Sequence, residues 1–428
     1  MNSYLSIIGT PYVSFSGSVR IYGAKNAALP AIAAALLSTE PVVLSNVPYL
    51  ADIASMITVI SSMGVEVSLL GSRQLSINSS NMHKSSPPAA WVQKIRASIL
   101  LLGPLLARNG YAKIAMPGGC AIGLRPILEH VSGLEALGAK VNISGNVITA
   151  SVSKLKGTVI NMSSVSVGAT ENLMMAAVLA EGVTVINNAA KEPEVIDLAN
   201  FLVSMGAMIS GAGTDSITIN GVAGLGSASH SVMPDRIEAG TFLIAAAASR
   251  GQINLTNCPI ADMTVVLDML KAVGAKIDIN GNNLSLDMCG KRPKALSFET
   301  MVYPGFPTDL QAQWAIMSAV SDGCSVIKEN IFDNRFNYIP ELMKMGANIT
   351  VKDNTLIING IEFLQGTKVF ATDLRAGAAL AIAGIIADGK TNLVNAHYLD
   401  RGYNDFEQKF RACGAIMHRE VSYEREYA

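Results

Sequence analysis

The chain has 428 residues, more than the roughly 250 to 300 that a single hydrophobic core usually supports, so we expect two domains. Its 32 Lys and Arg residues balance 33 Asp and Glu residues, which excludes the broad positive field that attracts nucleic acid or an anionic membrane surface. Half of the residues are hydrophobic, yet the longest apolar runs, 27–37, 97–107 and 376–387, are shorter than the 18 or so residues of a membrane-spanning helix. We therefore expect buried core helices, no nucleic-acid partner and no membrane insertion.

The first residues contain no basic region followed by an apolar stretch, so we expect no secretory signal. The five cysteines are odd in number and form no CxxC pair, which is typical of reduced thiols in the cytoplasm and gives no indication of a zinc site. No feature of the sequence specifies an oligomeric state.

A short pattern occurs six times along the chain: an apolar helical stretch, a glycine, and an alternating stretch typical of a strand. The six glycines are Gly64, Gly138, Gly206, Gly274, Gly346 and Gly414. Subtraction gives intervals of 74, 68, 68, 72 and 68 residues. Glycine after an apolar helix is a common helix end, and regular self-similarity indicates a repeated structural unit.

Each repeat is predicted to be mixed α/β, with a second strand after the glycine that closes the unit. Closing strands are predicted at 75–78, 217–221, 284–287 and 356–360. The sixth repeat lacks one, and residues 5–9 resemble 217–221, so we expect the N-terminus to complete it. This predicts three units per domain, with one domain at 21–230, the other at 1–20 plus 231–428, and a cleft between them that holds the active site.

Charged residues stand at the starts of the six apolar helices, where unpaired N–H groups favour anions. These residues are Lys25, Arg96, Glu171, Arg236 with Glu238, Asp309 and Arg375. For any one of them, the simpler interpretation is a polar group at the wetted end of a buried helix. Basic residues recur, however, and together with Arg125, Arg335 and Arg401 they would suit an acid of several negative charges, such as one with a phosphate and a carboxylate. Spacing alone does not show that they converge.

The segment "PGGCAIGLRP" at 117–126 has too much glycine for a helix and too little alternation for a strand, so we expect a mobile loop. It carries Cys120 five residues before Arg125. A cysteine on a loop beside a cation is unusual, because free cysteines are mostly buried and unreactive.

The segments "GAKNAALP", "PGGCAIGLRP", "SVGATEN", "PDRIEAGTFL", "YPGFPTDLQAQ", "TDLRAGAAL" and "DRGYNDFEQKFRACGA" occur in an order that resembles the UDP-N-acetylglucosamine 1-carboxyvinyltransferases. The resemblance extends over essentially the whole chain. It implies a two-domain inside-out α/β barrel, the enolpyruvyl transferase fold, with six βαβαββ-like units. It also implies a cytoplasmic transferase of peptidoglycan synthesis that moves the enolpyruvyl group of phosphoenolpyruvate onto UDP-N-acetylglucosamine, without a metal or organic cofactor.

The resemblance also assigns roles to individual residues. Cys120 matches the acid that protonates the methylene carbon, or that adds covalently to phosphoenolpyruvate, and Asp309 matches the base for the sugar hydroxyl. The alternative for Asp309 is an N-cap of the following helix. Lys25, Arg125 and Arg401 match the residues that bind phosphoenolpyruvate. The remaining expected substrate contacts are Asn26, Arg96, Pro126, Ile127, Leu128, Ser166, Val167, Gly168, Ile331, Arg335 and Arg375.

The chain differs from the family pattern at Leu128, where Asp is usual, at Ser164, where Lys is common, and at Leu100, where an aromatic residue is expected. One alternative is the sister enolpyruvyl transferase of aromatic amino-acid synthesis, but Asn26 and Cys120 weigh against it. A catalytically silent homologue that binds UDP-sugars or a regulatory partner is the other alternative. The presence of both Cys120 and Asp309 weighs against that interpretation.

Overall fold

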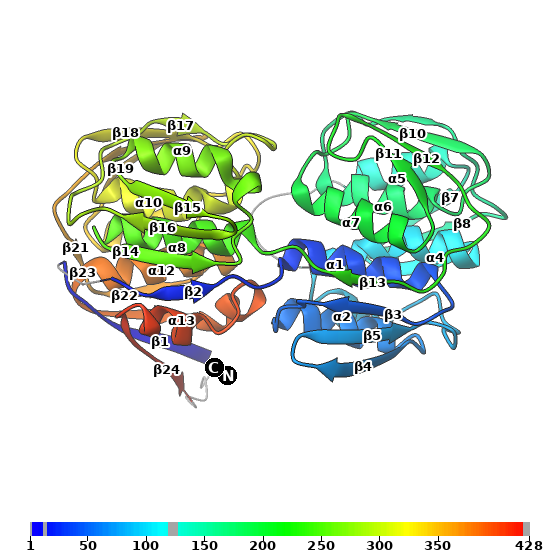
Figure 1. Cartoon of the computed structure of the whole chain (residues 1–428), viewed down its shortest axis with the longest axis horizontal. Coiled ribbons are helices and arrows are strands. Elements are labelled where there is room, and N and C mark those ends of the chain that lie inside the picture. The colour runs from blue at the N-terminus through cyan, green and yellow to red at the C-terminus, as the bar shows by residue number, and fades with distance from the viewer. Residues whose placement is uncertain (1, 12–14, 119–126, 423–428) are drawn as a thin grey trace. The chain divides into compact units, whose positions relative to one another are not determined.

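The computed structural model describes residues 2–11, 15–118 and 127–422, and in this part the chain is a mixed α/β protein with six sheets (Figure 1). Internal contacts divide the chain into two compact units. We call the described residues 23–118 and 127–233 the central unit. Residues 2–11, 15–22 and 234–422 form the terminal unit.

The central unit contains three sheets, in the orders β13-β3-β5-β4, β6-β8-β7 and β11-β12-β10-β9. Its strands are β3 (Val42–Ser45), β4 (Glu66–Gly71), β5 (Gln74–Asn78), β6 (Tyr111–Ala115), β7 (Lys140–Ser144), β8 (Val147–Ser151), β9 (Val159–Asn161), β10 (Val183–Asn187), β11 (Met208–Ser210), β12 (Ser216–Asn220) and β13 (Ser229–Ser231). Its helices are α1 (Lys25–Ala34), η1 (Ala35–Leu37), α2 (Ala51–Ser61), α3 (Ala89–Val92), η2 (Arg96–Leu101), α4 (Leu102–Asn109), α5 (Leu128–Ala136), α6 (Val167–Ala177) and α7 (Pro193–Ser204).

The terminal unit also contains three sheets, in the orders β15-β16-β14-β2, β17-β18-β20-β19 and β21-β23-β1-β24, with β22 paired to β23. Its strands are β1 (Asn2–Gly9), β2 (Ser18–Arg20), β14 (Gln252–Thr256), β15 (Lys276–Asn280), β16 (Asn283–Asp287), β17 (Phe298–Glu299), β18 (Cys324–Lys328), β19 (Asn348–Lys352), β20 (Thr355–Asn359), β21 (Leu364–Gln365), β22 (Lys368–Phe370), β23 (Ala387–Val394) and β24 (Ile416–Ser422). Its helices are α8 (Arg236–Ala248), η3 (Ile260–Met263), α9 (Thr264–Ala272), η4 (Thr308–Leu310), α10 (Gln311–Ala319), α11 (Ile339–Lys344), α12 (Leu374–Ile386), η5 (Ala396–Arg401) and α13 (Phe406–Ala412).

The repeat predicted from the six glycines is confirmed by their backbone conformation. All six have a positive φ, between 92° and 112°, which most residues with a side chain avoid and which ends a helix. After each glycine the chain enters a strand of a sheet. The predicted closing strands of four repeats match β5, β12, β16 and β20 to within one residue.

The N-terminal strand β1 completes the sixth repeat, as its sequence predicts. It pairs antiparallel with β24, with Ile7 opposite Met417, and antiparallel with β23, with Leu5 opposite Leu393. Leu5 and Ile7 are fully buried, so both the ladder hydrogen bonds and the hydrophobic core hold this strand.

Helices form the inside of each unit and account for the high hydrophobic content. Figure 1 shows α8, α10 and α12 within the terminal unit, with strands around them. All thirteen residues of α12 and all nine of α10 are buried, as are twelve of the thirteen residues of α8, the exception being Arg236. None of the helices within the described residues combines the length and apolar character that a membrane crossing requires.

Candidate active site

In the terminal unit, Asp309 lies between two arginines that come from distant parts of the chain. Its Oδ1 accepts a hydrogen bond from Arg335 Nη2 at 2.7 Å, and its Oδ2 accepts one from Arg375 Nη2 at 2.9 Å. Both arginine side chains are 4% exposed, whereas the Asp309 side chain is 26% exposed. Two charge-assisted bonds therefore hold the carboxylate in one orientation while part of it faces solvent.

Arg375 is fixed at the start of α12 by its own backbone and by its neighbours. Asp373 caps the helix, since its Oδ1 accepts from the N–H groups of Arg375 and Ala376 at 2.8 and 3.1 Å. The guanidinium carbon lies 5.4 Å from the centre of the buried Tyr403 ring. Burial by itself lowers the pKa of Arg375, but the Asp309 carboxylate outweighs it and the pKa lies above its ordinary value.

The N-cap interpretation of Asp309 is wrong. Asp309 lies within η4, and the residue at the N-cap of α10 is Leu310, which has no side-chain cap. The carboxylate is instead turned toward Arg335 and Arg375. Glu329 connects this segment to the predicted contact Ile331: it accepts from Thr308 Oγ1 at 3.0 Å and from the Ile331 N–H at 2.9 Å.

Arg401, also in the terminal unit, is the last residue of η5. Its neighbour Asp400 accepts from Arg419 Nη1 at 2.6 Å, and Arg419 Nε donates to Glu407 at 2.5 Å. Arg419 on β24 therefore ties the end of η5 to α13, which fixes the backbone that carries Arg401.

In the central unit, Lys25 is the first residue of α1, and its Nζ lies 3.3 Å from Asp52 Oδ2 in the first turn of α2. The two side chains are 12% and 7% exposed, so this ion pair lies in a mostly buried setting that fixes the direction of the lysine. Asn26, the next residue, is exposed.

The segment Ser166–Val167–Gly168 forms the start of α6. Ser166 is the N-cap, and its Oγ accepts from the Ala169 N–H at 3.3 Å. Val167 and Gly168 are half-buried residues of the first turn. Their N–H groups have no acceptor within the helix, because no turn precedes them. A helix start of this kind suits the oxygens of an anionic ligand.

Glu129, in the first turn of α5, holds the loop that leads to α6. Its carboxylate accepts from the Ser163 N–H at 3.2 Å, from the Ser163 hydroxyl, and from the Ser164 N–H and hydroxyl at 2.9 and 3.0 Å. Burial raises the pKa of Glu129, but the serine hydrogen bonds together outweigh it, so the pKa lies below its ordinary value. Leu128 beside it is 68% exposed and Ile127 is 7% exposed.

The structure thus divides the predicted site residues between the two units. Lys25, Asn26, Arg96, Ile127, Leu128 and Ser166–Gly168 belong to the central unit, and Asp309, Ile331, Arg335, Arg375 and Arg401 to the terminal unit. Direct contacts join Asp309 to Arg335 and to Arg375. The predicted residues Cys120, Arg125 and Pro126 lie outside the described residues.

Sequence reasoning missed several residues that hold the predicted ones: Asp52, Glu129, Glu329, Asp373, Tyr403 and Arg419. A signal existed for Asp373, because Asp before an apolar helical run is a typical N-cap. For the others, the contacts join segments far apart in the sequence, and no local pattern indicates them. Among residues 2–11, 15–118 and 127–422, no group of three or more His, Cys, Asp and Glu side chains is arranged to hold a metal ion.

Comparisons with known proteins give the family. A family model described as EPSP synthase (3-phosphoshikimate 1-carboxyvinyltransferase) matches residues 10–410. A protein named UDP-N-acetylglucosamine 1-carboxyvinyltransferase from Shewanella sp. (strain W3-18-1) is 51% identical over 405 residues, which cover 94% of this chain and 97% of the relative. The protein of that name from Shewanella sediminis (strain HAW-EB3) is 50% identical over 407 residues, or 95% and 97% of the two chains.

Solved structures show the same fold. The enolpyruvyl transferase NikO from Streptomyces tendae superposes with a TM-score of 0.89 at 24% identity, over 98% of this chain and 99% of that one. An EPSP synthase from Acinetobacter baumannii superposes with a TM-score of 0.74 at 18% identity, over 98% and 100%. The enolpyruvyl transferase fold expected from the sequence is therefore confirmed, and this protein belongs to the enolpyruvyl transferase family that includes the UDP-N-acetylglucosamine 1-carboxyvinyltransferases.

Proposed function

We propose that this protein transfers the enolpyruvyl group of phosphoenolpyruvate to the 3'-hydroxyl of UDP-N-acetylglucosamine, releases phosphate, and so carries out the first committed step of peptidoglycan synthesis in the cytoplasm. The observation that carries the proposal is that relatives of this name are half identical over 94% of the chain. The reaction requires an acid, a base and cations, and the sequence supplies them in Cys120, Asp309 and the basic residues assigned above.

The proposed first stage is addition to the enol. The Cys120 thiol gives its proton to the methylene carbon of phosphoenolpyruvate, and the sugar 3'-oxygen bonds to the adjacent carbon as its proton passes to Asp309. A carboxylate does this when it is ionised and within about 2.6 to 3.2 Å of the hydroxyl. Two hydrogen bonds from the arginines fix the direction of the Asp309 carboxylate.

The proposed second stage is elimination from the tetrahedral adduct. The methyl group formed in the first stage returns a proton to the Cys120 thiolate, and the carbon–carbon double bond forms again. The carbon–oxygen bond breaks with its electron pair on the phosphate, and the proton taken by Asp309 passes to the released phosphate. Lys25, Arg125 and Arg401 are assigned to the phosphate and carboxylate of phosphoenolpyruvate, where their charges oppose the negative charge of the phosphate as it leaves. The balance closes with the substrates alone, so the proposal includes no metal or organic cofactor.

The UDP-sugar is assigned to the start of α6 and to Asn26, Arg96, Pro126, Ile127, Leu128, Ile331, Arg335 and Arg375. The half-buried first turn of α6 supports this assignment, because it offers N–H groups to an anionic ligand. The proposal requires both units, since residues of each are assigned to the same pair of substrates. We propose 21–230 and 1–20 plus 231–428 as the two domains.

Phosphate release from phosphoenolpyruvate by the purified protein tests the function, with UDP-N-acetylglucosamine or shikimate 3-phosphate as the acceptor. We expect release with the UDP-sugar and no release with shikimate 3-phosphate. Cys120→Ala, assayed in the same way, should lose turnover and still bind the UDP-sugar.

The other outcomes identify the alternatives. Phosphate release with shikimate 3-phosphate alone would mean that the protein catalyses the EPSP synthase reaction, the activity named in the description of the matching family model. No release with either acceptor, together with binding of the UDP-sugar, would assign a catalytically silent homologue.

A further inference from the structure

The hydrogen bonds of Asn172 determine which nitrogen of His130 carries the proton. The Gly103 N–H donates to Asn172 Oδ1 at 2.7 Å, so this atom is the amide oxygen and Nδ2 is the donor. Nδ2 lies 2.9 Å from His130 Nδ1 and 3.3 Å from the Ile99 carbonyl oxygen, an acceptor. Because Nδ2 can only donate, Nδ1 must accept and carries no proton, which leaves the proton on Nε2.

The surroundings of His130 keep the ring neutral. The residue is 5% exposed. Burial and the positive charge of Arg96 on η2 lower the pKa of His130 to about 4, and the neighbouring Glu129 carboxylate only partly opposes them. Near neutral pH the ring therefore has a single N–H, at Nε2, and this N–H is a donor without a net charge.

The Nε2 edge of His130 faces the start of α6. A Cβ built on Gly168 would lie 3.6 Å from Nε2 and 3.5 Å from Cε1, and it would meet no other side chain of the described residues within 4 Å. Glycine at this position therefore leaves the ring edge uncovered. Within the described part of the chain, Nε2 has no hydrogen-bond partner, although the residue is 95% buried.

We propose that His130 is a substrate-binding residue whose Nε2–H donates to a phosphate oxygen of the UDP-sugar at the start of α6; this rests on the proposed function. The ring is mostly buried and no group of the described residues accepts from Nε2, so an acceptor in the ligand adds a hydrogen bond that the protein alone does not supply. Phosphate oxygens only accept, and the N–H groups of Val167 and Gly168 and the charge of Arg96 favour an anion at the same place.

The function of Asn172 in this arrangement is to select the tautomer. Its side chain is fully buried between Gly103, Ile99 and His130, so the amide cannot turn without leaving the Gly103 N–H unpaired. Asn172 accepts from the Gly103 N–H, which fixes its NH₂ group toward His130 Nδ1 and so places the ring proton on Nε2.

Two variants separate a binding role from a structural one, because each keeps one ring nitrogen's hydrogen bond. The amide of His130→Asn can occupy the position of Nδ1 and bond to Asn172, but it cannot reach Nε2. The amide of His130→Gln can place its NH₂ near the position of Nε2. The measurements are calorimetric titration with UDP-N-acetylglucosamine, the KM for each substrate, and thermal unfolding.

We expect the dissociation constant for UDP-N-acetylglucosamine to rise about tenfold or more in His130→Asn and less than about threefold in His130→Gln, since one hydrogen bond to a charged group is lost in the first and kept in the second. The KM for phosphoenolpyruvate should stay within about twofold in both variants. His83→Asn, an exposed histidine of the same unit, is the control and should bind as the wild type does.

Undiminished binding by His130→Asn would overturn the assignment while leaving the proposed function intact. Equal weakening in the two variants would also overturn it, because a structural role does not distinguish the two nitrogens. If the wild-type protein does not bind UDP-N-acetylglucosamine, both the proposed function and this assignment fail.

Discussion

Two buried or half-buried carboxylates in this protein are held by opposite kinds of partner. Asp309 in the terminal unit is held by two charged guanidinium groups, at 2.7 and 2.9 Å. Glu129 in the central unit is held by the neutral N–H and hydroxyl groups of Ser163 and Ser164. The two arginines leave the Asp309 side chain 26% exposed, whereas Glu129, which the serines enclose, is a buried residue.

The difference in partners suits Asp309 to proton transfer and Glu129 to holding neighbouring segments in place. A carboxylate fixed by charges at its sides still has lone pairs for a substrate proton, as the proposed base requires. The lone pairs of Glu129 are occupied by four donors, so we interpret it as an anchor between α5 and the loop before α6. The same region keeps His130 neutral, while the Asp309 region keeps Arg375 charged.

The largest expected effect in this comparison is that of Asp309→Asn. The amide cannot take the sugar hydroxyl's proton, so we expect turnover to fall about 10²- to 10⁴-fold, the usual range for loss of a general base. Steady-state phosphate release measures it. Asp333→Asn, an exposed aspartate near Arg335, should retain wild-type turnover. Turnover within threefold of wild type in Asp309→Asn would remove this residue from the proton transfer.

The second prediction concerns acid stability of the His130 region. The unfolded histidine has a pKa near 6.5 and the folded one about 4, so the unfolded state binds the extra proton between these values and stability falls as pH falls. Over that window the loss is about 3 kcal/mol. Urea unfolding from pH 7 to 4 should show a flatter pH dependence in His130→Gln than in the wild type. Parallel curves would mean that His130 does not titrate this way.

A smaller effect is expected for Glu129→Gln. The amide oxygen can still accept from the serines, but the NH₂ group is a donor that faces serine donors. We therefore expect the free energy of unfolding to fall by about 1 to 2 kcal/mol and the KM for UDP-N-acetylglucosamine to rise. Chemical denaturation and initial rates measure the two quantities. Glu135→Gln, an exposed glutamate on the same helix, is the control. Equal behaviour of the two variants would show that the serine contacts do not anchor α5.

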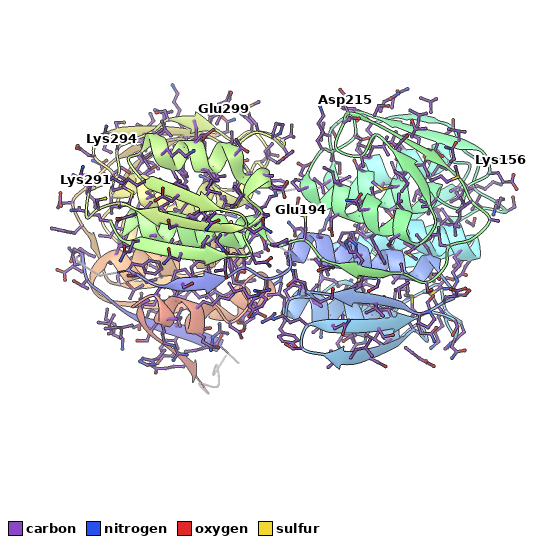
Figure 2. All side chains as sticks on the ribbon, viewed as in Figure 1. Lys156, Glu194, Asp215, Lys291, Lys294 and Glu299 are labelled. Atoms are coloured by element: carbon purple, nitrogen blue, oxygen red, sulfur yellow. The ribbon has the colours of Figure 1, made fainter. Side chains whose placement is uncertain are left out.

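The smallest expected effect is a gain in stability from Glu171→Gln. Glu171 on α6 is buried, and burial, with Glu194 and Glu192 nearby, raises its pKa well above the ordinary value. Glu194 lies in the first turn of α7 (Figure 2). A carboxyl whose folded pKa is raised loses its contribution to stability as pH rises, so the variant should melt a few degrees higher at pH 8 and similarly to the wild type at pH 4. A lower melting temperature at pH 8 would indicate that Glu171 is held by its charge.

Local sequence patterns were sufficient for the repeat and for the helix ends. Gly64 and Gly138 adopt the positive φ that their position after an apolar helix indicates, because a helix end depends on a few consecutive residues. The strand at 5–9 was recognised by its similarity to 217–221, and it lies in the sheet of the sixth repeat. The assigned roles of Cys120, Arg125 and Pro126 depend on the sequence and the family alone.

The sequence by itself determined the six repeats, the α/β class and the residue types that the proposed chemistry needs, since these follow from periodicity and short motifs. Only the tertiary structure decided that Asp309 is paired rather than a helix cap, because its partners are 26 and 66 residues away. It also decided the anchor at Glu129, 34 residues from Ser163, and the tautomer of His130, 42 residues from Asn172. Hydrogen bonds between separate elements depend on how the helices pack, and no local stretch of sequence carries that information.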